Sequence, residues 1–84
     1  MSSTADITIL YFAALREQVG KEQESRTITV GSTPAALYSQ LAQQYGFTLP
    51  QECVRAAVNH VFADWAQPLA ANDIVAFIPP VAGG

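Results

Sequence analysis

Residues 32–46 (STPAALYSQLAQQYG) carry the clearest secondary-structure signal in the chain, and this signal constrains the fold more than any other. Ser32 or Thr33 can cap the start of a helix, Pro34 suits its first turn, and Gly46 suits the position just after its last turn. Apolar residues recur within it at i, i+4 and i+8, as Leu37, Leu41 and Tyr45. This stripe predicts one long amphipathic helix whose apolar side is buried against a sheet.

Segments rich in β-branched and aromatic residues lie on both sides of this helix and predict strands. They cover residues 6–12, 25–30, 55–59, 60–64 and 74–79, and a short helix over residues 13–20 follows the first of them. This order predicts an α+β domain with one main helix packed across a mixed sheet. A β-grasp fold has this order, with its first and last strands side by side. We expect a disordered lead-in over residues 1–5, a β-grasp domain over residues 6–78 and an extended Gly-Gly tail over residues 79–84.

The first predicted strand is largely apolar on both of its faces. Alternation along the strand sends two sets of side chains to opposite sides, Ile7, Ile9 and Tyr11 against Thr8, Leu10 and Phe12. Such a strand is either central in the sheet or has one face reserved for a partner. Half of the residues are apolar and only 13% are charged, so a domain of 84 residues exposes some of its apolar surface.

Charge and residue usage exclude several classes of function. The net charge is −3 and the four Lys and Arg residues are scattered singly, which argues against a nucleic-acid ligand. Cys53 is the only cysteine, so one chain cannot form a disulfide or a CxxC site, and we interpret it as a small buried apolar residue. His60 is the only histidine, and we interpret it as a surface or turn residue. We expect no metal site and no active site within this chain alone.

The chain has no apolar run of membrane-spanning length and no signal-peptide pattern. We therefore expect a cytoplasmic protein with no membrane partner.

The last residues, PPVAGG, form an unusual ending. Pro79 and Pro80 favour an extended exit from the last strand. Gly83 and Gly84 have no side chain, so the chain is thin enough there to enter a narrow channel, and the carboxyl group of Gly84 is open to attack. This ending predicts a carrier that is loaded at its C-terminal carboxylate by another enzyme.

Two stretches resemble the small, sulfur-carrying subunits of molybdopterin synthase, the MoaD-type proteins. Residues 11–20 (YFAALREQVG) are similar to the first strand and short helix of that family, with its F-A-x-x-R-E-x-x-G pattern. Residues 56–84 are similar to its C-terminal third, including the A-V-N strand, the D-x-V-A-F strand and the P-P-V-x-G-G tail. The central helix fits the family in pattern only.

The resemblance implies a non-catalytic subunit that binds no cofactor. An adenylyltransferase related to ubiquitin-activating enzymes would adenylate Gly84 with ATP, and a sulfur donor would convert the product to a thiocarboxylate. The tail would then enter the large, catalytic subunit of the synthase and deliver sulfur to a cyclic pyranopterin precursor. The residues threading into the partner active sites would be Pro79, Pro80, Val81, Ala82 and Gly83. The family's apolar docking patch falls on Phe12, Phe62 and Ile78, although an aromatic residue often stands at the last position.

Other functions share parts of this pattern. Sulfur carriers of thiamine biosynthesis have the fold and the Gly-Gly ending, but they lack the Leu15-Arg16-Glu17 helix and the Pro79-Pro80 pair. A carrier for cysteine biosynthesis can also end in V-A-G-G. From other classes, a ubiquitin-like modifier would be joined through Gly84 to lysines of target proteins, and a plain binding module would make no use of its tail.

Overall fold

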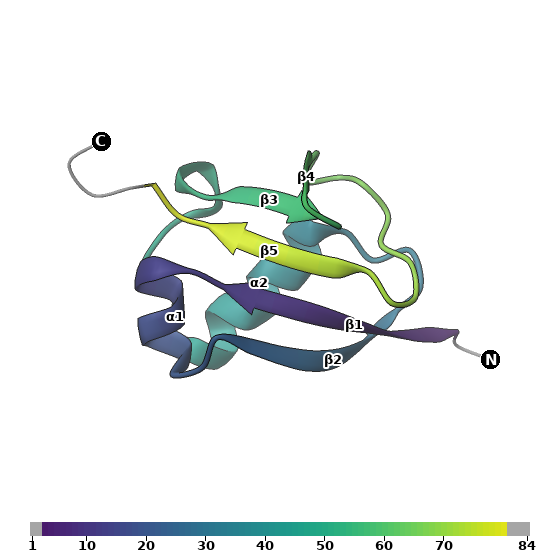
Figure 1. Ribbon diagram of the computed structural model, residues 1–84, viewed down its shortest axis with the longest axis horizontal. Helices are drawn as coiled ribbons and strands as arrows, with labels where there is room; N and C mark the ends of the chain where they lie inside the picture. The colour runs from purple at the N-terminus through teal and green to yellow at the C-terminus, as the bar shows by residue number, and fades with distance from the viewer. Residues whose placement is uncertain (1–2, 81–84) are drawn as a thin grey trace.

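The computed structural model describes residues 3–80, which form a mixed sheet with a helix across one face (Figure 1). Its strands are β1 (Thr4–Tyr11), β2 (Gln23–Thr29), β3 (Arg55–Val58), β4 (Val61–Ala63) and β5 (Ile74–Ile78). The helices are α1 (Ala13–Val19), α2 (Pro34–Tyr45) and a single 3₁₀ turn, η1 (Gln51–Cys53), which lies outside the helices and strands predicted from the sequence.

The strand order across the sheet is β2-β1-β5-β3-β4. The first and last strands, β1 and β5, are parallel neighbours with Leu10 opposite Ala76, and the other pairs are antiparallel. A parallel pair needs a long crossover connection. Here the connection consists of all the other elements, which lie between β1 and β5 in the sequence. The predicted β-grasp arrangement is confirmed.

The predicted signals at both ends of α2 are confirmed in the structure. The Thr33 hydroxyl oxygen accepts a hydrogen bond from the Ala36 N–H at 3.2 Å, and Pro34 occupies the first turn. After the last turn, Gly46 takes a left-handed conformation with φ of 71°, which its missing Cβ permits.

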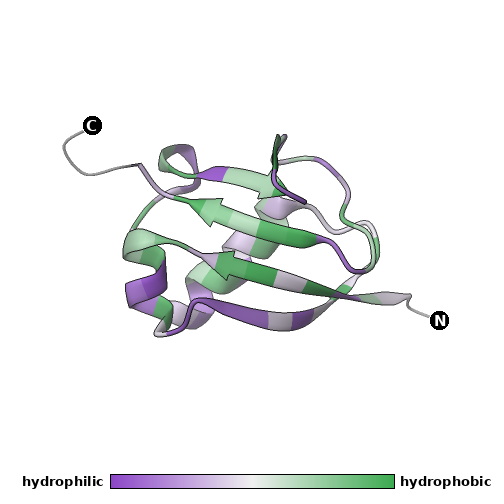
Figure 2. Cartoon of the chain, in the orientation of Figure 1, coloured by the Kyte–Doolittle hydropathy of each residue, from purple (hydrophilic) through white to green (hydrophobic). Residues whose placement is uncertain are grey.

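The core lies between α2 and the sheet. Two residues of the predicted stripe, Leu37 and Leu41, are fully buried, and Tyr45 is half-buried. Tyr38 is also buried, which the stripe did not predict, and its hydroxyl donates to the Leu49 carbonyl at 2.6 Å. The inward-facing strand residues that complete this layer are Ile7, Ile9, Tyr11, Ile28, Ala56, Val58, Val75 and Phe77. Figure 2 shows the resulting contrast between the largely apolar strands β1 and β5 and the polar edge strand β2.

The start of the domain differs from the prediction. Thr4 already pairs with Thr29 in the β1–β2 ladder, Ala5 is buried, and the Ser3 carbonyl accepts a hydrogen bond from Val30 at 3.0 Å. The predicted lead-in of residues 1–5 is therefore wrong for residues 3–5, and the remaining two lie outside the described residues. Residues 3–5 carry no strand signal in their sequence. Pairing of Thr4 and Ala5 with β2 extends β1 toward the N-terminus.

A carboxylate on the inner face of β2 ties three elements together. Glu24 Oε1 accepts hydrogen bonds from the hydroxyls of Tyr11, at 2.5 Å, and Tyr45, at 2.7 Å. The ammonium of Lys21 and the guanidinium of Arg26 lie 3.9 and 3.7 Å from its other oxygen. Burial alone would raise the pKa of Glu24, but the two hydroxyls and the two cations together outweigh burial and hold that pKa below its usual value. Burial, and then the bond to this carboxylate, raise the pKa of Tyr11 far above its usual range.

The charge on Glu24 should therefore stabilise the fold in a pH-dependent way. We expect Glu24→Gln to lower the free energy of unfolding by about 1–2 kcal/mol at neutral pH, since it weakens two hydrogen bonds to a charged acceptor. A depressed pKa contributes stability above the unfolded value of about 4.3 and loses it as pH falls through the folded value. The deficit should therefore shrink between pH ~5 and ~3. Urea unfolding across this range measures it.

The matched control is Glu17→Gln, which removes a carboxylate from an exposed position on α1. It should leave stability almost unchanged at every pH. A Glu24→Gln deficit that is the same at pH ~3 as at pH ~7 would contradict the charge-based account.

Candidate functional site

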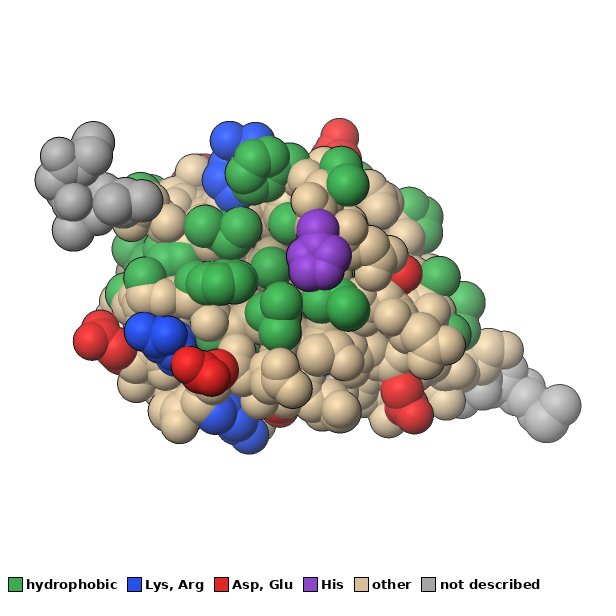
Figure 3. Space-filling view, viewed as in Figure 1, with side chains coloured by type: hydrophobic (Ala, Val, Ile, Leu, Met, Phe, Trp, Pro, Cys, Tyr) green, Lys and Arg blue, Asp and Glu red, His purple; other side chains and the backbone are tan. Residues whose placement is uncertain are grey.

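The sheet face opposite α2 is uncovered, and apolar side chains gather on it. Figure 3 looks onto this face and shows them grouped around the chain's histidine. They include two of the large apolar side chains that remain exposed, Phe12 at 42% and Phe62 at 60%. The strand that the sequence analysis found apolar on both faces, β1, contributes Leu10 to this side.

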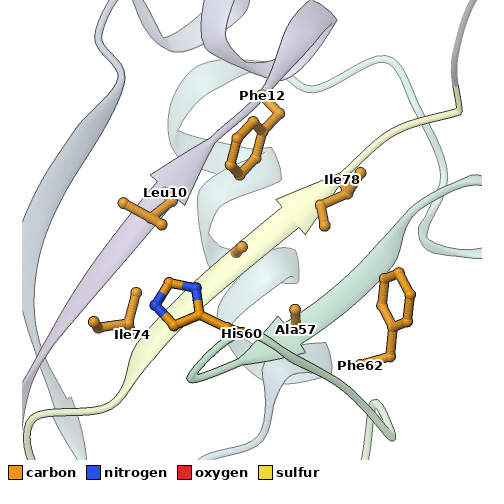
Figure 4. Close-up of a pocket in the computed structure, with 8 residues that line it drawn as sticks. Leu10, Phe12, Ala57, His60, Phe62, Ile74 and Ile78 are labelled. Atoms are coloured by element: carbon orange, nitrogen blue, oxygen red, sulfur yellow. The ribbon is translucent and has the colours of Figure 1, made fainter.

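These side chains enclose a depression of about 240 Å³, which we call the apolar hollow (Figure 4). Its lining comprises Leu10, Phe12, Ala57, His60, Phe62, Ile74, Ala76 and Ile78.

The strand register explains why the surface is hollow at this place. Leu10, Ala76, Ala57 and Phe62 stand opposite one another in a row across β1, β5, β3 and β4. The two central members of the row are alanines, so the floor is low between larger side chains at both ends. A partner's side chain therefore has a shaped, apolar place to enter.

The three residues that the resemblance assigned to a docking patch, Phe12, Phe62 and Ile78, all line this hollow. Their role in docking stays a prediction. The alanine floor and Ile74 were not predicted as part of the surface. The alternation along β3 and β5 was the available signal, because Ala57, Ile74 and Ala76 occupy outward positions on those strands.

His60 stands at one end of the hollow, in the turn between β3 and β4. As the sequence analysis expected, it is an exposed turn residue. Asn59 and His60 both have positive φ, 52° and 72°, the combination that a two-residue hairpin turn requires. The Asn59 side chain donates to Asp73 Oδ1 at 3.0 Å and accepts from the Ile74 N–H at 2.9 Å. This end of the hollow is thereby fixed to the start of β5.

The C-terminal tail leaves the domain beside the hollow. Phe12 and Ile78 line both the hollow and a neighbouring groove, and that groove also includes Pro79, Pro80 and residues of α1. Pro79 is buried and Pro80 is exposed. β5 ends at Ile78, and the buried ring of Pro79 lies in the groove that residues of α1 also line. The extended course of the tail from Pro79 onward stays a prediction. Val81, Ala82, Gly83 and Gly84 lie outside the described residues.

Cys53 differs from its prediction. It is exposed at the end of η1, and the buried apolar residue of this segment is its neighbour Val54. The 3₁₀ turn directs Cys53 outward, and the sequence showed no sign of this turn.

Within residues 3–80, no group of three His, Cys, Asp or Glu side chains is placed to hold a metal ion. None of the helices described over the same range is long and apolar enough to cross a membrane.

The sequence of this chain is similar to a known family over most of its length. Residues 9–84 match the ThiS family. The molybdopterin synthase sulfur carrier subunit of Escherichia coli (strain K12) is 34% identical over 80 residues, covering 93% of this chain and 99% of that protein. The protein of the same name from Mycobacterium tuberculosis (strain ATCC 25618 / H37Rv) is 38% identical over 81 residues, covering 93% of this chain and 96% of that protein.

Solved structures share the fold. SAMP1 from Haloferax volcanii superposes with a TM-score of 0.79 at 20% identity, covering 95% of this chain and all of that one. A chain from the complex of subunits 1 and 2 of molybdopterin-converting factor from Helicobacter pylori 26695 superposes with a TM-score of 0.62 at 22% identity, covering 94% of this chain and 99% of that one. These likenesses establish the ubiquitin-like β-grasp architecture.

The left-handed turn at the edge of the hollow leads to a paired prediction. Glycine adopts positive φ without strain, so His60→Gly should raise the free energy of unfolding by about 0.5–1 kcal/mol. Asn59→Gly relieves similar strain but removes both hydrogen bonds to the start of β5, and it should lower stability. Denaturant unfolding of both variants measures the difference. Equal effects of the two substitutions would show that the Asn59 hydrogen bonds do not hold this turn.

Proposed function

The chain belongs to the ThiS family, and on this basis we propose that it is the sulfur-carrying small subunit of a molybdopterin synthase. The observation that carries the proposal is the similarity to two sulfur carrier subunits along almost their whole length. The geometry supports it independently, because an exposed apolar hollow lies directly beside the point where a Gly-Gly tail leaves the domain.

The proposed chemistry takes place at the carboxylate of Gly84. A carboxylate oxygen attacks the α-phosphorus of ATP on an adenylyltransferase, and pyrophosphate leaves. The resulting acyl-adenylate is a good electrophile, whereas the free carboxylate is a poor one. Hydrosulfide released by a sulfur donor then attacks the carbonyl carbon, the bond from that carbon to the AMP oxygen breaks, AMP departs, and a thiocarboxylate remains. Glycine suits this position because no side chain shields the carbonyl carbon.

The thiocarboxylate would act inside the large subunit. Its sulfur is a better nucleophile than a carboxylate oxygen, and it would pass to a cyclic pyranopterin precursor of the molybdopterin dithiolene. The catalytic side chains of this step belong to the partner. The Helicobacter pylori neighbour, described as a complex of subunits 1 and 2, supports a large-subunit partner for this chain as well. The adenylyltransferase and the sulfur donor are further parts of the proposal.

Other functions of the same fold are alternatives that an experiment separates. Carriers for thiamine or cysteine biosynthesis would load sulfur in the same way and deliver it elsewhere. The likeness to SAMP1, described in a second Haloferax volcanii structure as small archaeal modifier protein 1, favours a protein modifier as the second candidate. A modifier would form isopeptide bonds from Gly84 to lysines, which survive denaturing electrophoresis.

The first test uses the chain with Gly84 deleted. We expect the intact chain to co-elute with the large subunit on size exclusion and to yield molybdopterin once it has been loaded with sulfur. The deleted chain should still bind, because the hollow is intact, but it should form no thiocarboxylate by mass spectrometry and no product. Equal product from both chains would refute every carrier function. A folded chain that carries a thiocarboxylate but does not bind the large subunit would move the assignment to another pathway.

A second test concerns the hollow. Truncating an aromatic residue that anchors an interface costs about 2 kcal/mol or more, so Phe62→Ala should weaken the complex with the large subunit roughly 30-fold. Phe62 is 60% exposed, and the fold should not change. Val30→Ala is the matched control, because Val30 is also an exposed apolar residue but does not line the hollow. Titration calorimetry compares the two. Equal affinities for both variants would contradict docking through this face.

A further inference from the structure

The four basic residues of this chain are not equivalent. Three of them lie beside carboxylates, as Arg16 with Glu22 at 3.6 Å, Lys21 with Glu24 at 3.9 Å, and Arg26 with Glu24 at 3.7 Å. The fourth is Arg55, which makes no such pair within residues 3–80. In a chain of net charge −3, this exposed residue carries a positive charge that no carboxylate of the described residues pairs with.

Arg55 stands at the margin of the apolar hollow. It opens β3 two residues before Ala57, so both side chains lie on the same outward face, and in the register it is opposite Ile78. Its guanidinium carbon lies 4.2 Å from the centroid of the Phe62 ring. Phe62 and Ile78 both line the hollow (Figure 4), and Ile78 is the last strand residue before the tail. The cation therefore lies against one lining residue of the hollow and opposite the last strand residue before the tail.

Stacking on Phe62 prepares this guanidinium for a further interaction. A guanidinium that lies over an aromatic face is restrained there, while the N–H groups at its edge remain free to donate to a planar carboxylate. Arginine stays charged at every physiological pH. The eight residues that line the hollow include no Asp or Glu that would compete for the cation.

We propose that Arg55 is a specificity-determining residue of the docking surface, and this rests on the proposed function. The apolar hollow takes an apolar side chain of the large subunit, and Arg55, held against Phe62, pairs with a carboxylate next to that side chain. A partner that carries only the apolar side chain fills the hollow but leaves Arg55 without a carboxylate. The pair thereby distinguishes between partners of similar apolar shape.

The test compares Arg55→Met with Arg55→Lys in binding to the large subunit at low and high salt. Methionine keeps an apolar stem against Phe62 and removes the charge, so Arg55→Met should weaken binding roughly tenfold at ~50 mM salt. The deficit should shrink at ~500 mM, where screening weakens the wild-type pair. Arg55→Lys keeps the charge but lacks the bidentate fork of the guanidinium. Its affinity for the large subunit should lie between those of the wild type and Arg55→Met. Lys21→Met, which removes a cation outside the hollow, should stay within about twofold of wild type.

The outcomes separate the two proposals. If the wild-type chain fails to bind the large subunit, the proposed function is wrong and the inference falls with it. If the wild type binds and Arg55→Met binds equally well at both salt concentrations, only the inference is overturned. A deficit of the same size at both salt concentrations would assign Arg55 a packing role and would also overturn it. The inference would also be overturned if Arg55→Met lost affinity for the adenylyltransferase but not for the large subunit. Thermal unfolding of each variant confirms that the exposed substitution leaves the fold intact.

Discussion

The parallel pairing of β1 with β5 is the interaction on which the rest of the structure depends. Parallel strands end at the same edge of a sheet, so the register of Tyr11 with Phe77 places the next residues, Phe12 and Ile78, at one corner. On the inner face, Tyr11 and Phe77 are fully buried in the core. At that corner the chain turns from β1 into α1. After β5 it continues through Pro79 to the exposed Pro80. One strand pairing thereby anchors the core and brings the tail to the edge of the hollow.

The two faces of the sheet differ in how their side chains are covered. The inner face is filled by large side chains and closed by α2, and the Glu24 carboxylate on it is satisfied by two tyrosine hydroxyls and two cations. The outer face has alanines at the centre of its strands and large apolar side chains at the margin. A face of this kind contributes little to folding because it remains in contact with water. Its apolar area becomes favourable only when a partner covers it.

Local signals allowed most of the fold to be predicted from the sequence. Thr33, Pro34 and Gly46 define the bounds of α2 through their own backbone preferences, so their neighbours in space matter little. The features that were missed depend on contacts between distant segments. Thr4 becomes a strand residue only because Thr29 is opposite, and Pro79 is buried only because β5 ends near α1. The same holds for the candidate site: alternation placed Phe12 outward, but only the strand order brings it together with Phe62.

The apolar hollow and the C-terminal tail consist of different residues, which matters for a carrier that must bind more than one partner. Under the proposed function the modified residue is Gly84, which is not one of the residues that line the hollow, so loading it would leave the composition of that surface unchanged. Affinity from the apolar hollow is then shared by every partner that presents a complementary side chain, because burial of apolar area is non-directional. Discrimination requires a group whose interaction depends on position and charge. Arg55 is such a group, because its stacking on Phe62 couples the charge to the same ring that lines the hollow. A rim charge acts mainly on encounter rate and partner choice, which lets a carrier distinguish its partners without binding any of them so tightly that it cannot leave.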